Sequence, residues 1–157
     1  MQLTSAAFQA GAEIPSYFTS DGDDVSPELS WKDAPQETKS FALIVHDPDA
    51  PRTGGFTHWV VYNIAPETAH VEENVPDAET IAGVGIQGKN DAGKIGYMGP
   101  APPSGVHRYF FRLFALETRL DLRPGATHKQ VSAAMKGHIL AQAELMGTYE
   151  KKSQRAA

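Results

Sequence analysis

Three strongly apolar runs constrain the fold of this chain more than any other feature. They are residues 41–47 (FALIVHD), 57–64 (THWVVYNI) and 107–116 (HRYFFRLFAL). Each run is rich in β-branched or aromatic residues, and its apolar side chains occupy both sets of alternate positions, as expected of a strand covered on both faces. We therefore expect these runs to be the central strands of a sheet or sandwich.

The rest of the chain is punctuated by turn residues rather than by long helical patterns. Its 14 glycines and 11 prolines recur between short β-rich runs, and no internal repeat or low-complexity linker divides the 157 residues. A chain of this length has the size of one domain and can bury a continuous core. We expect a single, mostly β domain over residues 1–157.

One segment has helical periodicity. Thr127 and Gln130 have the spacing of a capping box, in which two side chains satisfy free N–H groups at a helix start. Apolar residues then follow nearly one helical face, and Gly147 stands where a C-terminal cap would lie. The pattern predicts one amphipathic helix at about 128–146, packed against an antiparallel sandwich.

Composition excludes several classes of protein. The net charge of -5 argues against general nucleic-acid binding, which requires a basic face. The absence of cysteine excludes disulfides and thiolate chemistry. No apolar run approaches the roughly 20 residues that span a membrane, and the first residues lack the pattern of a signal peptide. We expect a cytoplasmic protein.

The string GVGIQGKN at 83–90 partly matches two phosphate-binding fingerprints. Both fingerprints need a helix directly afterwards, because its free N–H groups hold the phosphate. The following residues, DAGKIGYMGPAPPSG, are too rich in glycine and proline for a helix. We therefore expect no nucleotide site, and no cofactor.

Polar side chains adjoin the ends of the apolar runs. In an extended chain alternate side chains share a face, so Asp47 and Asp49 are expected to point together, as are His107 and Tyr109. His58 opens the run expected beside the first. The pattern indicates a site of two carboxylates, two imidazoles and a phenol at one end of the sheet.

Each of these residues also has a structural interpretation. The aspartates of DPDAP at 47–51 are typical turn residues, and His58 and His107 could be core histidines held by one hydrogen bond. Arg108 and Arg112 fall on the face opposite His107 and are expected to be solvated or salt-bridged. No special role is expected for the other histidines, which are His46, His70, His128 and His138.

Taken together, the segments resemble the phosphatidylethanolamine-binding protein family, and most closely its short bacterial branch of Raf kinase inhibitor-like proteins. The resemblance rests on five ordered motifs: DPDAP at 47–51, THWVVYN at 57–63, QGKND at 87–91, GYMGPAPP at 96–103 and GVHRY at 105–109. It extends to both ends of the chain, at 14–27 and 134–149. Met98 and Ala101 depart from the pattern, where glycine and cysteine respectively are common.

The resemblance implies an antiparallel β-sandwich with a small ligand pocket at one end, a C-terminal helix nearby, and a homodimer. The pocket wall would include the loop 99–103. The implied ligand-binding residues are Asp47, Asp49, Pro51, His58, Pro102, His107 and Tyr109.

Physical chemistry limits the ligand of such a site. An anion near an ionised carboxylate is repelled by about 1 kcal/mol in water and about 4 kcal/mol near a protein surface. The aspartates are therefore expected to orient the histidines or face an ammonium group, while imidazole, phenol and backbone N–H groups donate to the anion. We expect a small anionic ligand, such as phosphate, acetate, a phospholipid head group or a phosphorylated side chain.

Other classes of function stay open at this point. Asp47, Asp49, His58 and His107 could hold zinc or manganese for a metal-assisted hydrolase, although their spacing is no established metal signature. A hydrolase using Ser104, His107 and Asp47 lacks the G-x-S-x-G elbow. The resemblance also suggests a regulatory protein that inhibits a kinase or protease through the pocket rim.

Overall fold

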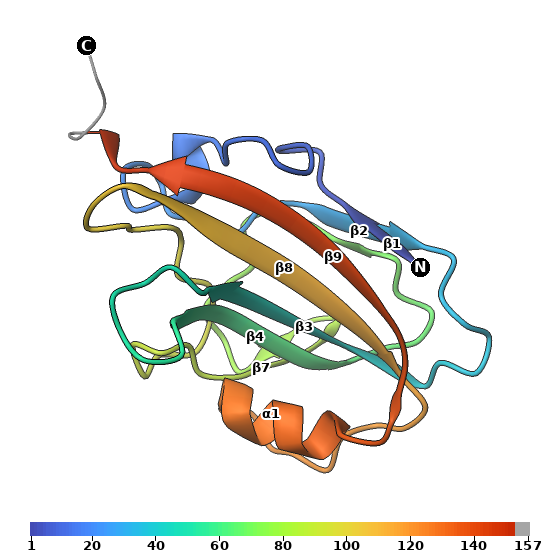
Figure 1. Cartoon of the computed structure of the whole chain (residues 1–157). Coiled ribbons are helices and arrows are strands. Elements are labelled where there is room, and N and C mark those ends of the chain that lie inside the picture. The colour runs from blue at the N-terminus through green and yellow to red at the C-terminus, as the bar shows by residue number, and fades with distance from the viewer. Residues whose placement is uncertain (153–157) are drawn as a thin grey trace.

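The computed structural model describes residues 1–152 and has two antiparallel sheets (Figure 1). The larger sheet has the strand order β6-β7-β4-β3-β8-β9 and the smaller has β1-β2-β5. The strands are β1 (Gln2–Thr4), β2 (Leu29–Lys32), β3 (Ser40–Asp47), β4 (Phe56–Ile64), β5 (His70–Val71), β6 (Thr80–Ile81), β7 (Gly85–Gln87), β8 (Val106–Leu116) and β9 (Ile139–Glu150), with one 3-10 turn at Ser16–Phe18. The expected mostly β, antiparallel class is confirmed.

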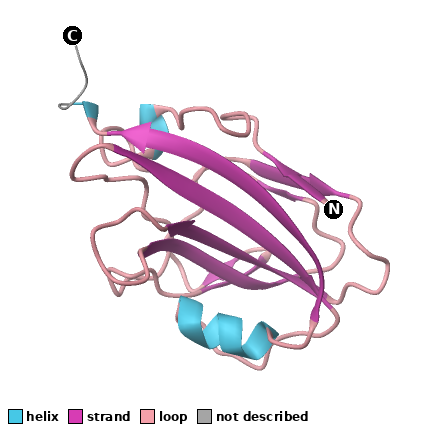
Figure 2. Ribbon diagram, viewed as in Figure 1, coloured by secondary structure: helices cyan, strands magenta, loops and turns pink. Residues whose placement is uncertain are grey.

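The three apolar runs form adjacent strands, as expected. β3 lies between β4 and β8, and nearly all of its residues are buried. Side chains on one face, including Phe41 and Trp59, join a core cluster with Leu29 and Trp31 of the small sheet. The opposite face packs against helix α1 (His128–Met135), which covers that side of the large sheet (Figure 2). β3 and β4 are buried on both faces, as expected, whereas alternate residues of β8, such as Arg108 and Arg112, are exposed or partly exposed.

The predicted helix is correct at its start and wrong at its end. Thr127 and Gln130 form the expected capping box, but the helix ends at Met135 and Gly137 adopts a left-handed φ of 85°. Residues 139–150 form β9, which pairs with β8 from Val106↔Glu150 to Leu116↔Ile139. The apolar residues of this segment fit both a helical and an alternating pattern, and long-range strand pairing outweighs the local preference.

β9 is also joined to the beginning of the chain. The N–H groups of Gly11 and Ile14 donate to the carbonyl oxygens of Met146 and Thr148. Further along β9, the hydroxyl of Tyr149 donates to Asp21 across 2.6 Å. Residues 11–21 therefore cover the edge of β9 that β8 leaves open.

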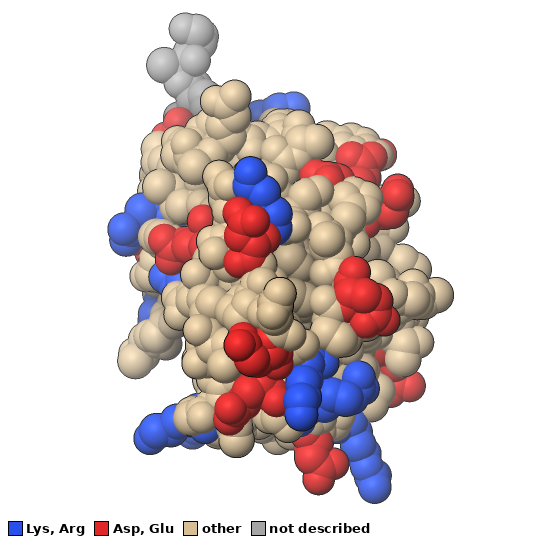
Figure 3. Space-filling model, turned by 90° about the vertical axis from the view of Figure 1, so that its right-hand side faces the viewer, with Lys and Arg blue, Asp and Glu red and all other residues tan. Residues whose placement is uncertain are grey.

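The surface has mixed charge. On the face in Figure 3, Lys and Arg side chains are interspersed with Asp and Glu rather than gathered into one basic area. Within residues 1–152, no helix is both long and apolar enough to cross a membrane.

Candidate functional site

A β-bulge in β4 positions the candidate site. Val45 of β3 pairs with Trp59, but the next residue, His46, pairs with Thr57, so His58 is the extra residue. Thr57 and Trp59 would share a face in a regular strand, yet Trp59 lies in the core with the small sheet, whereas Thr57 bonds to His46 and His128 on the helix side. Bulges re-aim side chains in this way next to binding sites. Here the bulge turns His58 toward Tyr109, whose ring centroid lies 5.2 Å away.

A cavity of about 190 Å³ lies beside His58 at this end of the large sheet. Its walls come from the end of β3, the segment 50–58, the loop 98–103 and the start of β8. Most of the lining is apolar, with polar groups at one side. The lining residues are Asp47, Ala50, Pro51, Arg52, Phe56, His58, Met98, Ala101, Pro102, Pro103, His107 and Tyr109.

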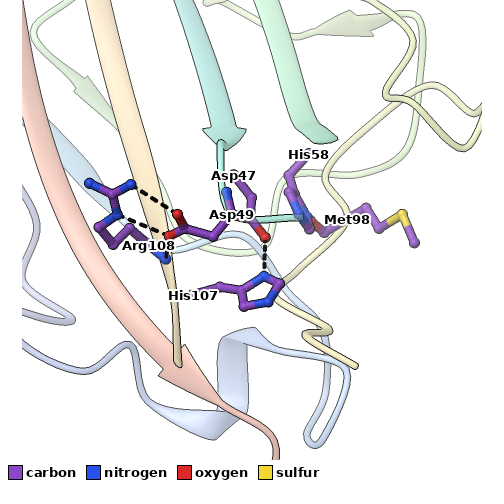
Figure 4. Close-up of polar contacts among 6 residues, drawn as sticks. All are labelled: Asp47, Asp49, His58, Met98, His107 and Arg108. Atoms are coloured by element: carbon purple, nitrogen blue, oxygen red, sulfur yellow. Dashed lines mark hydrogen bonds and ion pairs between the residues drawn. The ribbon is translucent and has the colours of Figure 1, made fainter. Parts of the chain in front are cut away.

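Asp47 and His107 form a buried pair at the polar side of the cavity (Figure 4). The Nδ1 atom of His107 lies 2.6 Å from Oδ2 of Asp47, and the two side chains are 8% and 3% exposed. Because an ionised carboxylate can only accept, Nδ1 carries the hydrogen. The other oxygen of Asp47 accepts the N–H of Asp49 at 2.7 Å. This arrangement fixes the ring of His107 and leaves its Nε2 atom for a ligand.

His58 is fixed in the same way by a neutral partner. Its Nδ1 atom donates to the carbonyl oxygen of Met98 across 2.6 Å, while the N–H of Met98 donates to the carbonyl of His58. Burial is the main cause that lowers the pKa of His58, and it outweighs the opposing effects of Met98 and Asp47. The imidazole is therefore neutral near pH 7, with an Nε2 lone pair at the cavity.

Tyr109 supplies a third polar group. Its buried hydroxyl lies beside Asp47 and has no well-formed hydrogen bond within residues 1–152. Burial, followed by the nearby charge of Asp47, raises the pKa of Tyr109. The phenol is therefore protonated, and its O–H is a donor that a ligand can use.

Asp49 differs from the expectation that it points with Asp47. Its carboxylate accepts two hydrogen bonds from the Arg108 guanidinium and one from the Arg108 backbone N–H, all at 2.9 Å. These bonds with Arg108 hold the pKa of Asp49 at about 2, although partial burial opposes them. The turn after Asp47 rotates the second aspartate away, so Asp49 anchors the turn on the opposite face of β8.

The cavity wall at 98–103 is tied to the segment 16–24. The Gly99 N–H donates to Oδ1 of Asp24 at 2.8 Å, and the Tyr97 hydroxyl donates to the carbonyl of Phe18 at 2.6 Å. A Cβ at Gly99 would lie 2.3 Å from the Phe18 carbonyl oxygen, so this close contact requires glycine. Prolines at 100, 102 and 103 further restrict the wall.

The GVGIQGKN string has a structural role, and it is followed by turns rather than by a helix. Gln87 is fully buried: its amide oxygen accepts the Trp59 indole N–H, and its amide nitrogen donates to the carbonyls of Pro76 and Ala78. Asn90 closes the following turn through its side chain. The string thus supports the strand that carries His58.

The geometry also bears on the hydrolase alternatives. Within residues 1–152, no three His, Asp or Glu side chains are arranged to hold a metal ion. Ser104 is exposed, does not line the cavity and makes no hydrogen bond to His107 in this part of the chain. Ser104 is therefore not placed to act as a nucleophile activated by the Asp47–His107 pair.

Six of the seven predicted site residues line the cavity: Asp47, Pro51, His58, Pro102, His107 and Tyr109. The seventh, Asp49, does not. Sequence reasoning missed two lining residues, Arg52 and Phe56. The guanidinium group of Arg52 lies over the Phe56 ring, with its central carbon 5.5 Å from the ring centroid. Their positions in the sequence, between the DPDAP motif and His58, could have indicated that they lie at the cavity. It also missed the direct bond between His58 and Met98.

Comparisons with known proteins agree on one family. The family model described as "Phosphatidylethanolamine-binding protein" matches residues 4–150. A UPF0098 protein of Methanothermobacter thermautotrophicus is 54% identical over 151 residues, covering 96% of this chain and 99% of the relative. Another, from Aquifex aeolicus, is 49% identical over 154 residues, covering 96% and 89%.

Two crystal structures are similar over nearly the whole chain. CT736 of Chlamydia trachomatis, described as a homolog of phosphatidylethanolamine-binding protein, has a TM-score of 0.88 at 46% identity and covers 96% of this chain and 97% of its own. YbcL of E. coli, described as a new member of the mammalian family, has a TM-score of 0.88 at 31% identity and covers 96% and 98%.

Proposed function

The chain belongs to the phosphatidylethanolamine-binding protein family, and we propose that its cavity binds a small oxyanion, of which a phosphate group is the best fit. One observation carries this proposal. His58 and His107 are each fixed through Nδ1, so both rings offer an Nε2 atom that has no hydrogen bond among residues 1–152 at a mostly apolar cavity. The buried hydroxyl of Tyr109 is available as a further donor.

The protonation state of His58 selects among phosphate ligands. A neutral His58 accepts at Nε2, so it suits the P–OH group of a phosphate or phosphomonoester. A phosphodiester, as in a phospholipid head group, has no such hydrogen, and it would require a charged His58. The second pKa of a phosphomonoester is about 6, so the P–OH form is abundant only near or below that pH. We expect phosphate and phosphomonoesters to bind more tightly than diesters at pH 6.

Asp47 restricts the position of the anion. Its carboxylate repels an anion in direct contact by about 1 to 4 kcal/mol, depending on the dielectric environment. The bound oxygens therefore belong near the Nε2 atoms and the Tyr109 hydroxyl. Asp47 would act by orienting His107, and an ammonium group on a zwitterionic ligand would suit the Asp47 side of the cavity.

Titration with inorganic phosphate, followed by NMR of the imidazole signals, tests the proposal. We expect the signals of His58 and His107 to move and saturate together. His107→Ala should weaken binding by about 1.5–3 kcal/mol, the usual contribution of a hydrogen bond to a charged group. His138→Ala is the matched control, since the His138 side chain is 44% exposed and pairs with Glu117 away from the cavity. Unchanged His58 and His107 signals would overturn the proposal.

The family suggests that ligand binding serves a regulatory or inhibitor role, with the cavity rim presented to a kinase or protease. Arg52 and Pro103 are exposed at this rim, which gives a partner direct access. Affinity capture with the wild-type chain and with a His58→Ala/His107→Ala variant tests this role. The role requires a kinase or protease that the double variant loses. Sedimentation equilibrium tests the homodimer expected from the family.

A further inference from the structure

A second cleft lies on the opposite face of the large sheet, at the first turn of α1. Its volume is about 460 Å³, and polar groups from β3, β4, α1 and two loops surround it. The lining residues are His46, Arg52, Thr53, Gly54, Gly55, Thr57, Asp91, His128, Lys129 and Ser132. Among residues 1–152, Arg52 alone lines both this cleft and the first cavity. The β4 bulge separates them, since Thr57 faces this cleft and His58 faces the cavity.

Two histidines share one hydroxyl group at the base of this cleft. Oγ1 of Thr57 lies 3.0 Å from Nδ1 of His46 and 2.7 Å from Nδ1 of His128, and the ring centroids are 5.3 Å apart. The hydroxyl has one hydrogen, so it donates to one imidazole and accepts Nδ1–H from the other. In the neutral cluster, the imidazole that accepts from the hydroxyl therefore carries its hydrogen on Nε2. The imidazole that donates Nδ1–H to the hydroxyl has no hydrogen on Nε2.

One added proton fits this network without breaking it. The proton enters at the bare Nε2, and the resulting imidazolium keeps its Nδ1–H bond to Thr57. Both rings then present Nε2–H donors, and the cluster carries one positive charge. Neither Nε2 atom has a hydrogen bond among residues 1–152, so both donors are available. The backbone N–H groups of Thr53 and Gly54, also at the cleft, have no partner in the same range.

The surrounding charges favour an anion over a cation. Arg52 and Lys129 line the cleft, and Arg112 of β8 is near enough to affect His128. The only carboxylate in the lining, Asp91, accepts the Thr57 N–H at 2.7 Å. Burial, followed by His46, lowers the pKa of His128, so the unliganded His128 ring favours the neutral form.

We infer that this cleft is a second binding site, for a tetrahedral oxyanion whose binding is coupled to uptake of one proton by the His46–Thr57–His128 cluster. The anion would accept from the two Nε2–H groups and would be attracted by Arg52 and Lys129. This inference does not depend on the function of the first cavity, because the two sites use different histidines.

Sulfate is the suitable probe, because it stays a dianion at neutral and mildly acidic pH, so any coupled proton belongs to the protein. NMR titration at several pH values should move the His46 and His128 signals. Above the pKa of the unliganded cluster, uptake of one proton makes the affinity about tenfold tighter for each unit by which the pH falls. The double variant His46→Gln/His128→Gln should abolish this pH dependence, whereas His138→Gln should leave it unchanged.

Lys129→Gln provides a second test, on an exposed residue. It should weaken sulfate binding several-fold and keep the pH dependence. Unmoved His46 and His128 signals, or an affinity independent of pH, would overturn the inference. If phosphate moves only the His58 and His107 signals, the proposal for the first cavity stands and the proposal for the second cleft fails. If phosphate moves only the His46 and His128 signals, the second cleft is supported and the function proposed for the first cavity fails.

Discussion

His107 donates its Nδ1 hydrogen to Asp47 across 2.6 Å, and both side chains are almost completely buried. Removal of one partner leaves a buried polar group unpaired, which is more costly than loss of the bond itself. We expect Asp47→Ala to lower the free energy of unfolding by about 3 kcal/mol. Asp47→Asn should cost less, because its amide oxygen still accepts from His107. Urea unfolding measures both, and equal losses would contradict this account.

Arg108 and Asp49 make the protein sensitive to strong acid. Their hydrogen bonds lower the pKa of Asp49 to about 2, so the folded state binds fewer protons than the unfolded state as the pH falls below about 4. The stability that they contribute is present above this range and is lost as the pH approaches 2. Arg108→Ala should cost at most about 1 kcal/mol at pH 7, because the pair is partly exposed.

Urea unfolding of the wild type and of Arg108→Ala, measured between pH 5 and pH 2, tests this account. The difference in stability between wild type and Arg108→Ala should shrink across this range. Lys32→Ala, a change at another exposed cation, serves as the control. A constant difference at every pH would show that Arg108 acts through packing on Phe110 rather than through Asp49.

Buried His58 should make stability depend on pH in the neutral range. Burial lowers the pKa of His58, so the unfolded chain takes up a proton first as the pH falls below about 6.5. Stability is therefore full above this pH and decreases below it. His58→Gln should reduce the slope between pH 7.5 and 5.5 in urea unfolding. His128 contributes a slope of the same sign, so a part of the slope should persist in this variant.

Gly99 sets the position of the cavity wall. Gly99→Ala would place a methyl group against Oδ1 of Asp24 and the carbonyl oxygen of Phe18, each 2.3 Å from the ideal Cβ. Overpacking of this kind typically costs about 1–3 kcal/mol. We expect lower thermal stability and weaker phosphate binding. Asp24→Gly removes the hydrogen bond without adding volume, and glycine tolerates the left-handed φ of 58° at this position, so it should affect stability less.

Gln87 supports β4 from behind the cavity. Gln87→Ala leaves the Trp59 indole and two backbone carbonyls without a partner, at about 1–3 kcal/mol for each buried group that water cannot reach. We expect a large loss of stability in urea unfolding, compared with little change for Lys89→Ala on the exposed side of the same turn. A small effect would mean that water replaces the amide.

The sequence was sufficient to predict the central strands, because the apolar residues of 41–47, 57–64 and 107–116 occupy both sets of alternate positions. It was not sufficient for the segment after Gly137. The alternating spacing of a strand is present at Ala143, Leu145 and Tyr149. The spacing of a helical face is present at Val131, Met135 and Ile139. Pairing with β8, which the local pattern does not contain, determines that residues 139–150 form a strand.

The candidate site shows a similar division. The family motifs named six of the twelve residues that line the cavity, and both the motifs and the alternation rule placed Asp49 with Asp47. The rule fails there because β3 ends at Asp47 and the next residues turn toward Arg108. It also cannot reveal the bulge at His58, since one extra residue leaves no mark in the hydrophobic pattern.

The pairing of β9 with both β8 and residues 11–14 has a consequence for synthesis of the chain. Residues 11–14 leave the ribosome early, yet their partners at 146–148 are added only after more than 130 further residues. Until then the edge of β8 is also unpaired, and exposed strand edges favour self-association. Nascent chains that stall before β9 should therefore depend on chaperones, whereas chains that include it can close the sheet at once.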